Sequence, residues 1–123
     1  MLLDTFAWIE YFSGAESGRI VEKILKKEQC HTSILSISEI SVWCIKNNKN
    51  ISERVGVIRS LSKILFINED IATIGAKVNC DIKKTIKDFG MVDSLIYATA
   101  IYFGLKLVTG DPHFKNLENI IML

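Results

Sequence analysis

The stretch Met91–Gly104 constrains the fold more than any other part of the chain. It reads MVDSLIYATAIYFG, carries one charge at Asp93, and is followed by no other charged residue until Lys106. As a helix it has no wide polar stripe, so nearly every side of it must be covered by other parts of the protein. The sequence therefore predicts a central helix with Asp93 in its first turn, where the helix dipole favours a negative charge.

Short apolar segments alternate with amphipathic ones along the rest of the chain. Strands are expected at residues 1–4, 30–35, 64–67, 106–109 and 119–123. Helices are expected at residues 5–12, 15–29, 51–62 and 71–89, and Gly90 would close the last of these as a C-cap. A further helix is expected to reach residue 45, with Ser36 or Ser38 as its N-cap. Strands that alternate with helices indicate an α/β fold with a mostly parallel sheet of four to five strands, covered on both faces.

Composition and charge limit the class of protein. The chain has 123 residues, which suits one domain, and it is 49% hydrophobic with a mean hydropathy of +0.26. Part of this apolar surface is expected to lie in a subunit or partner interface. Because the net charge is only +1, a nucleic acid would have to be held by a local patch or through metal ions.

Cysteine usage and the N-terminal segment bear on the compartment. Cys30, Cys44 and Cys80 are odd in number and form no CxxC pair, so neither a disulfide framework nor a zinc knuckle is indicated. The segment MLLD has no basic region and reaches an acid at Asp4, unlike a signal peptide. No uncharged apolar run approaches the roughly 18 residues that a membrane span needs. We therefore expect a reduced, cytoplasmic protein with no membrane partner.

Four acidic residues stand at comparable places beside apolar segments: Asp4, Glu39, Asp93 and Asp111. Ligand sites of open parallel sheets lie beyond the carboxyl ends of the strands. Asp4 closes the first expected strand, and Glu39 follows the second, in the first turn of its helix. Asp111 comes two residues after the fourth strand, and Asp93 can reach the same rim if the central helix begins there. The four carboxyl groups are therefore expected to converge.

Carboxylates that share a cleft repel one another by about 4 kcal/mol per close pair at an effective dielectric near 20. Such a cluster persists either by sharing protons or by binding divalent cations. No His or Cys accompanies these acids at ligand spacing, and an all-oxygen site suits Mg²⁺ or Mn²⁺ rather than zinc. Such a site can hydrolyse phosphodiesters, because the metal activates a bound water.

The segments around the four acids resemble the acidic motifs of the PIN-domain ribonucleases, in their order and spacing, and most closely those of the single-domain VapC-type toxins of prokaryotic toxin–antitoxin modules. They read LLDT at Asp4, SISEI at Glu39, VDSLIYATA at Asp93 and LVTGDPHF at Asp111. The resemblance covers essentially the whole chain and implies a single PIN domain over residues 1–123 with a three-layer α/β/α fold. It further implies a Mg²⁺- or Mn²⁺-dependent endoribonuclease that acts on RNA, forms a homodimer and is inhibited by a cognate antitoxin.

The resemblance also assigns roles to residues. Asp4, Glu39, Asp93 and Asp111 match the catalytic, metal-binding acids of the family. Thr109 matches a hydroxyl residue that orients the acids through hydrogen bonds. Pro112 could turn the carboxylate of Asp111 away from the metal.

Structural roles compete with these assignments. Asp4 could cap a helix, Glu39 could complement a helix dipole, and Asp111 is a common turn residue. His31 and His113 are expected to be structural or to face solvent, although His113 is close enough to Asp111 to touch a substrate. The lysines at positions 77, 83, 84 and 87 are expected to form a solvated helix face, which could also steer RNA.

Two other functions remain open from the sequence. The same acids could serve a metal-dependent DNA nuclease or phosphatase. Alternatively, the chain could be a non-catalytic PIN-like or receiver-like module. The receiver alternative is the poorer one, because Asp4 has no adjacent acid and no lysine follows Thr109 late in a strand.

Overall fold

The structure is a computed structural model that describes residues 1–123. Its strands are β1 (Leu2–Leu3), β2 (His31–Ser33), β3 (Lys63–Leu65), β4 (Leu107–Thr109) and β5 (Ile120–Met122). Its helices are α1 (Thr5–Ser13), α2 (Glu16–Lys27), α3 (Ile34–Lys46), α4 (Ile51–Leu61), α5 (Glu69–Ile82), α6 (Met91–Phe103) and the short 3₁₀ helix η1 (Pro112–Phe114). None of these helices has the length and apolar character to cross a membrane.

The strands form one sheet in the order β3-β2-β1-β4-β5, and every neighbouring pair is parallel. Strand β1 lies in the middle, with Leu2 opposite His31 of β2 on one side and opposite Leu107 of β4 on the other. The expected parallel sheet is therefore confirmed, and it has five strands.

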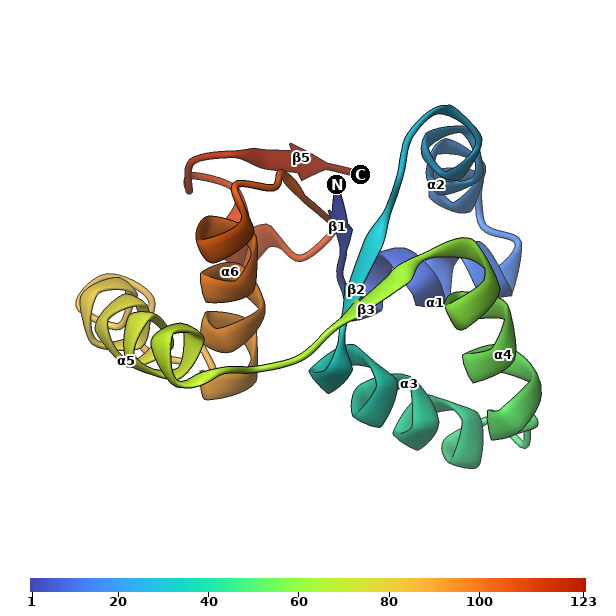
Figure 1. Cartoon of the computed structure of the whole chain (residues 1–123), viewed down its shortest axis with the longest axis horizontal. Coiled ribbons are helices and arrows are strands. Elements are labelled where there is room, and N and C mark those ends of the chain that lie inside the picture. The colour runs from blue at the N-terminus through green and yellow to red at the C-terminus, as the bar shows by residue number, and fades with distance from the viewer.

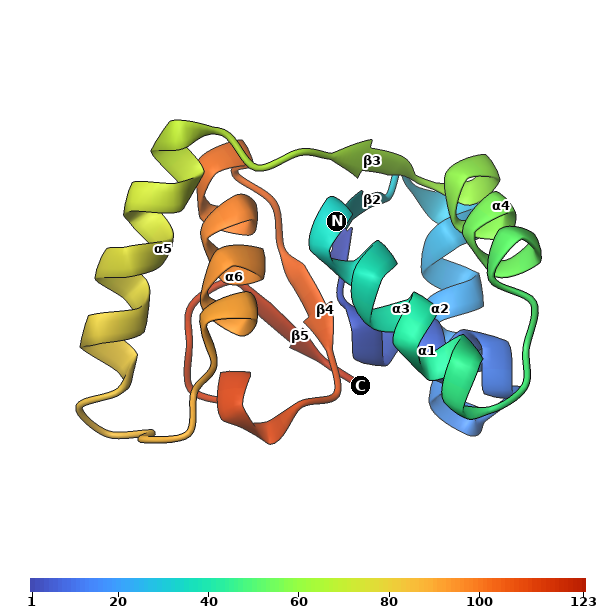
Figure 2. The same ribbon diagram turned by 90° about the horizontal axis from the view of Figure 1, so that it is seen from below.

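Helices cover both faces of the sheet because neighbouring strand residues point to opposite sides. Leu2 and Leu107 belong to one core cluster, which includes residues of α5 and α6. Leu3 and Val108 belong to a second cluster, which includes residues of α1 to α4. Figures 1 and 2 show α5 and α6 side by side on one side of the strands and α1 to α4 on the other. The molecule therefore has three layers, α/β/α.

The junction between β2 and α3 differs from the sequence-based prediction. The strand ends at Ser33, whose hydroxyl accepts a hydrogen bond of 3.1 Å from the backbone N–H of Leu35 and so caps α3. Residues 34 and 35 are therefore helical, and neither Ser36 nor Ser38 is the cap. Because α3 begins earlier than predicted, Glu39 lies in its second turn, and its placement in the first turn was wrong.

The predicted helix over residues 71–89 is also wrong at its C-terminal end. Helix α5 ends at Ile82, and Gly90 is the N-cap of α6 rather than a C-cap. The chain turns back because Phe89 is fully buried in the core. The side-chain amide of Asn79 secures this turn by donating to the carbonyl of Phe89 at 3.2 Å and to the hydroxyl of Ser94 at 2.9 Å.

The central helix α6 is buried only in its middle. Ile96 and residues 98–100 are buried, whereas Met91, Val92 and residues 101–103 are between 38% and 50% exposed. A helix of 13 residues is about 20 Å long, but strands of two or three residues span only about 10 Å. Both ends of α6 therefore extend beyond the sheet, and the prediction that nearly every side is covered was wrong there.

Gly18 offers a direct test of the packing between α1 and α2. A Cβ added at Gly18 would collide with the backbone carbonyl group of Glu10, which cannot move without shifting α1. Gly18→Ala is therefore expected to lower the free energy of unfolding by roughly 1–3 kcal/mol, the usual cost of overpacking. The measurement is urea denaturation followed by circular dichroism.

Gly56→Ala in α4 is the matched control, because a Cβ there meets no atom within 4 Å. Its free energy of unfolding should be unchanged or higher by about 0.5–1 kcal/mol, since alanine favours a helix over glycine. Equal effects of the two substitutions would contradict the proposed close contact.

Candidate active site

One cavity of about 400 Å³ collects all four of the predicted acids: Asp4, Glu39, Asp93 and Asp111. Its remaining lining consists of Thr5, Phe6, Ile9, Ile96 and Pro112, with no lysine, arginine or histidine. The cavity lies beyond the carboxyl ends of β1 and β4, where connections from the middle of the sheet diverge to opposite sides. We refer to it as the acidic cavity.

Asp4 serves the fold and the cavity at once. It follows β1 directly and is the N-cap of α1, with Oδ1 accepting a hydrogen bond of 2.9 Å from the backbone N–H of Ala7. The residue is only 5% exposed. The capping role considered from sequence is therefore present, and it coexists with the position of Asp4 in the acidic cavity.

Glu39 is held by a residue that the sequence analysis did not single out. The hydroxyl of Thr5, the first residue of α1, donates a hydrogen bond of 2.5 Å to Oε1 of Glu39 in α3. This bond joins residues 34 positions apart, so no local pattern reveals it. The only local sign of this role in the sequence is that Thr5, a hydroxyl residue, directly follows Asp4. Thr5 also lines the acidic cavity.

Asp93 lies in the first turn of α6 and is half-buried. The N-cap is Gly90, which has no side chain to cap the helix, and its backbone hydrogen-bonds to the carboxyl group of Asp93. The start of α6 is fixed also by Ser94, whose hydroxyl donates to the carbonyl of Gly90 at 2.9 Å and accepts from Asn79. These contacts place the carboxyl group of Asp93 at the acidic cavity.

Asp111 and Thr109 are tied together at the end of β4. The hydroxyl of Thr109 accepts a hydrogen bond of 3.0 Å from the backbone N–H of Asp111. The carboxylate of Asp111 then caps η1, with Oδ1 accepting from the backbone N–H of His113 at 2.9 Å. Although Pro112 follows it, Asp111 still lines the acidic cavity.

His113 connects the site to the loop before α6. Its Nδ1 lies 3.2 Å from Oδ1 of Asp111, and its Nε2 lies 3.3 Å from Oδ2 of Asp88. His113 therefore has a structural role, as one of the two sequence-based alternatives proposed. Asp88 was not foreseen, because a surface acid 25 positions before His113 carries no local sign of this contact.

Burial raises the pKa of both central acids. Loss of solvent raises the pKa of Asp4 to about 7, Thr109 and the N–H of Ala7 oppose the rise, and the charges of Asp111 and Asp93 add to it. Burial is also the main cause that raises the pKa of Asp93 to about 6, and the charges of Asp111 and Glu39 raise it further. Because no basic side chain offsets these acids, the cavity favours the binding of protons, or of another cation, near neutral pH.

The donor chemistry of the cavity fits a hard divalent cation. Four carboxyl groups and the hydroxyl of Thr5 offer only oxygen, which Mg²⁺ and Mn²⁺ prefer. No three His, Cys, Asp or Glu side chains are grouped closely enough to form a ready-made metal site. Mg²⁺ commonly keeps several waters and takes only one or two carboxylates directly, so binding here would not require three side chains grouped around the ion.

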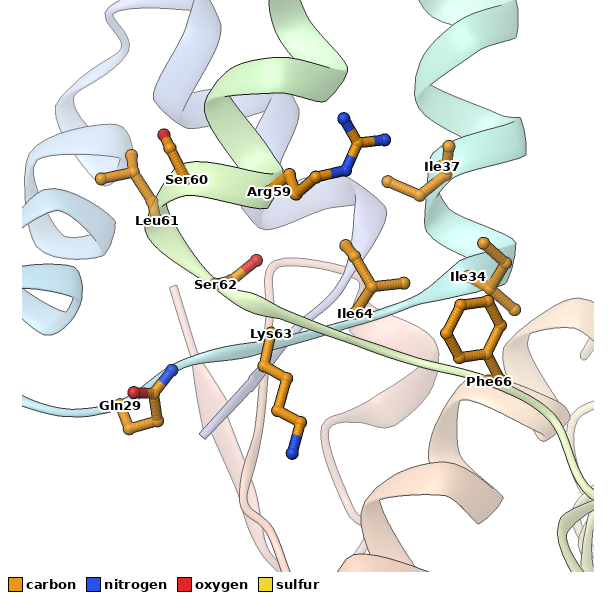
Figure 3. A pocket seen from close by; sticks show the side chains of 10 residues that line it. All are labelled: Gln29, Ile34, Ile37, Arg59, Ser60, Leu61, Ser62, Lys63, Ile64 and Phe66. Carbon is orange, nitrogen blue, oxygen red and sulfur yellow. The ribbon is translucent and has the colours of Figure 1, made fainter.

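The largest cavity of the protein lies elsewhere and contains none of these acids. It measures about 700 Å³ and is lined chiefly by residues of α3, the end of α4 and β3. Figure 3 shows Arg59 beside Ile37 and Ile64 in this cavity. Size alone therefore does not single out the acidic cavity, which is distinguished by its chemistry.

Several solved structures share this architecture. A chain of a toxin–antitoxin complex from Klebsiella pneumoniae is 25% identical, with a TM-score of 0.79 over 98% of this chain and 95% of that one. VapBC2 from Rickettsia felis, bound to a promoter DNA fragment, is 18% identical, with a TM-score of 0.78 over 99% and 96%. A sarcin–ricin loop cleaving VapC toxin of Mycobacterium tuberculosis is 11% identical, with a TM-score of 0.75 over 96% and 95%.

Comparison with curated protein sequences gives no significant match. The sequence model of the PIN domain, in contrast, matches residues 1–120, nearly the whole chain. The parallel five-stranded sheet between two helical layers agrees with the PIN-like fold of the VapC structures. The chain therefore belongs to the PIN domain family.

Proposed function

We propose that this protein is a Mg²⁺- or Mn²⁺-dependent endoribonuclease and the toxin of a toxin–antitoxin module. The observation that carries the proposal is the convergence of four acids, from four separate segments, on one cavity that contains no basic side chain. Membership of the PIN family and likeness to the toxin–antitoxin complex of Klebsiella pneumoniae support it.

Asp4 and Asp93 would be the principal ligands of the cation, with Glu39 and Asp111 completing the set. A divalent ion held there would activate a water and offset the charge of the phosphodiester. Thr5 orients Glu39 through its hydrogen bond, and the backbone N–H and ring of His113 hold one oxygen of Asp111. Thr109 contributes by fixing the backbone of Asp111 and by lowering the pKa of Asp4.

The partners belong to the same proposal. Toxin–antitoxin complexes among the similar structures support a cognate antitoxin for this chain. The exposed apolar side chains at both ends of α6, together with Val42 and Ile45 of α3, supply surface for a homodimer or for the antitoxin. We further propose that residues 1–123 act as a single PIN domain on RNA in the cytoplasm.

Cleavage of RNA is the first test of this proposal. Purified protein is expected to cut single-stranded RNA when Mg²⁺ or Mn²⁺ is present and to stop when EDTA removes the metal. Asp4→Asn and Asp93→Asn should each abolish cleavage, because each removes a charged ligand of the cation. The measurement is gel analysis of a labelled RNA with and without added metal.

Asp70→Asn is the matched control for Asp93→Asn. Asp70 also lies in the first turn of a helix, α5, but it is exposed and does not line the acidic cavity. Its cleavage rate should equal that of the wild type. Wild-type cleavage rates in both Asp4→Asn and Asp93→Asn would overturn the proposal. If the protein cuts DNA in preference to RNA, DNA would be assigned as the substrate instead.

Stability without metal provides a second test, through its dependence on pH. The folded-state pKa values of about 7 for Asp4 and about 6 for Asp93 exceed the ordinary value of 3.8. The folded state therefore binds more protons than the unfolded state between these limits. The stability that these protons contribute is fully present below about pH 4 and is lost as the pH rises through 6 and 7.

Asp93→Asn should relieve part of this loss. At pH 7.5 in EDTA we expect its free energy of unfolding to exceed that of the wild type by about 1 kcal/mol, after allowance for solvent screening. Urea denaturation between pH 4 and pH 8 measures both proteins, with Asp70→Asn as the control. A marked destabilisation by Asp93→Asn would instead assign Asp93 to helix initiation.

Added metal should reduce the difference in stability between Asp93→Asn and the wild type. At a Mg²⁺ concentration ten times its Kd, the wild type should gain about 1.4 kcal/mol of unfolding free energy, and Asp93→Asn should gain less. Thermal or urea denaturation with a Mg²⁺ titration measures the difference. An equal gain in both proteins would show that Asp93 does not hold the ion.

A further inference from the structure

We propose that four lysines at the C-terminal end of α5 and in the loop after it form a track that holds the RNA strand as it enters the acidic cavity. These residues, called the lysine track, are Lys77, Lys83, Lys84 and Lys87, and all four are exposed. The inference rests on the proposed function, since it names the surface that would bind the substrate of that site.

The acidic cavity cannot hold a nucleic acid with its own side chains. It is lined by four acids and no basic residue, so its field repels phosphates until cations neutralise it. Beyond a phosphate held by a metal ion, affinity for a polyanion must therefore come from lysines or arginines outside the cavity. The site needs a basic surface close enough to hold the same strand.

Two separate hollows lie between the acidic cavity and part of the lysine track. A second hollow of about 480 Å³ shares Pro112 with the acidic cavity and is lined also by Lys84 and His113. A third hollow of about 530 Å³ shares Lys84 with the second and adds Lys77. Lys77 and Lys84 thus line hollows that are linked to the acidic cavity through shared lining residues, although Asp81 lines both hollows as well.

The loop that carries the track is held in place against η1. Asp88 of this loop contacts Nε2 of His113 at 3.3 Å. The ring of Phe89 packs edge to face on Phe114, with the ring centroids 5.3 Å apart. Because His113 also contacts Asp111, these contacts link the loop that carries Lys83, Lys84 and Lys87 to the acidic cavity.

The lysines are free to exchange their present contacts for phosphates. Lys84 is paired only with Asp81, at 3.7 Å, and both side chains are more than 75% exposed. Exposed ion pairs of this kind contribute little to stability. Thr85 and Asn116 beside Lys84 add neutral hydrogen-bonding groups, which suit phosphates and ribose hydroxyls.

The test compares Lys77→Ala/Lys84→Ala with wild type. One assay measures steady-state cleavage of random-sequence single-stranded RNA dodecamers with Mg²⁺, and the other measures binding of the same RNA in EDTA by fluorescence anisotropy, both across a salt titration. We expect a higher KM with kcat unchanged, weaker binding, and a salt slope of log K reduced by about 0.7 for each lysine.

Lys26→Ala is the matched control. Lys26 lies in α2, is 73% exposed and pairs with Glu22 at 3.1 Å, much as Lys84 pairs with Asp81. It should leave KM, binding and the salt slope unchanged. Equal behaviour of Lys26→Ala and the double variant would overturn the lysine track.

The two proposals fail in different ways. If wild-type protein does not cleave RNA with either metal, the proposed function is wrong, and the anisotropy arm alone then decides whether these lysines bind RNA. If cleavage occurs but the double variant matches wild type, only the track is wrong. A competition experiment separates RNA from acidic peptides. If polyglutamate displaces the labelled RNA as effectively as unlabelled RNA does at equal charge concentration, the surface is an acidic-peptide site and the track is also wrong.

Discussion

Electrostatic repulsion among carboxyl groups in the acidic cavity is the constraint on which the rest of the site depends. The cavity brings four acids together with no basic side chain among them. Burial and the neighbouring charges raise the pKa of Asp4 to about 7 and that of Asp93 to about 6. A fold that keeps such a group together needs contacts strong enough to oppose the repulsion, and a proton or cation that relieves it.

The opposing contacts each join an acid to another part of the chain. Thr5 at the start of α1 bonds Glu39 in α3, and His113 ties Asp111 to Asp88. Asp4 is held by the first turn of α1, through Ala7. Because neighbouring strands are parallel, the segments that follow β1, β2 and β4 begin at the same edge of the sheet.

The sequence predicted the parallel sheet, the central helix and the segments that carry the acids, since all of these follow from hydrophobic periodicity. Element ends were less predictable. Ser33, rather than a later serine, caps α3 through a bond to Leu35, and Gly90 begins α6 because burial of Phe89 turns the chain. Contacts such as Thr5 with Glu39 join distant residues, so no local pattern could have revealed them.

The small net charge of +1 conceals a separation of charge that the fold creates. Acids meet in the acidic cavity, while the lysines of the C-terminal end of α5 stay outside it. A lysine inside the cavity would pair with a carboxylate and compete with a divalent cation for the same oxygens. Under the proposed function, this arrangement would leave the carboxylates available to a metal and the exposed lysines, of which Lys84 pairs with Asp81, available to phosphates. Such an arrangement depends on where helices end, so composition alone cannot disclose it.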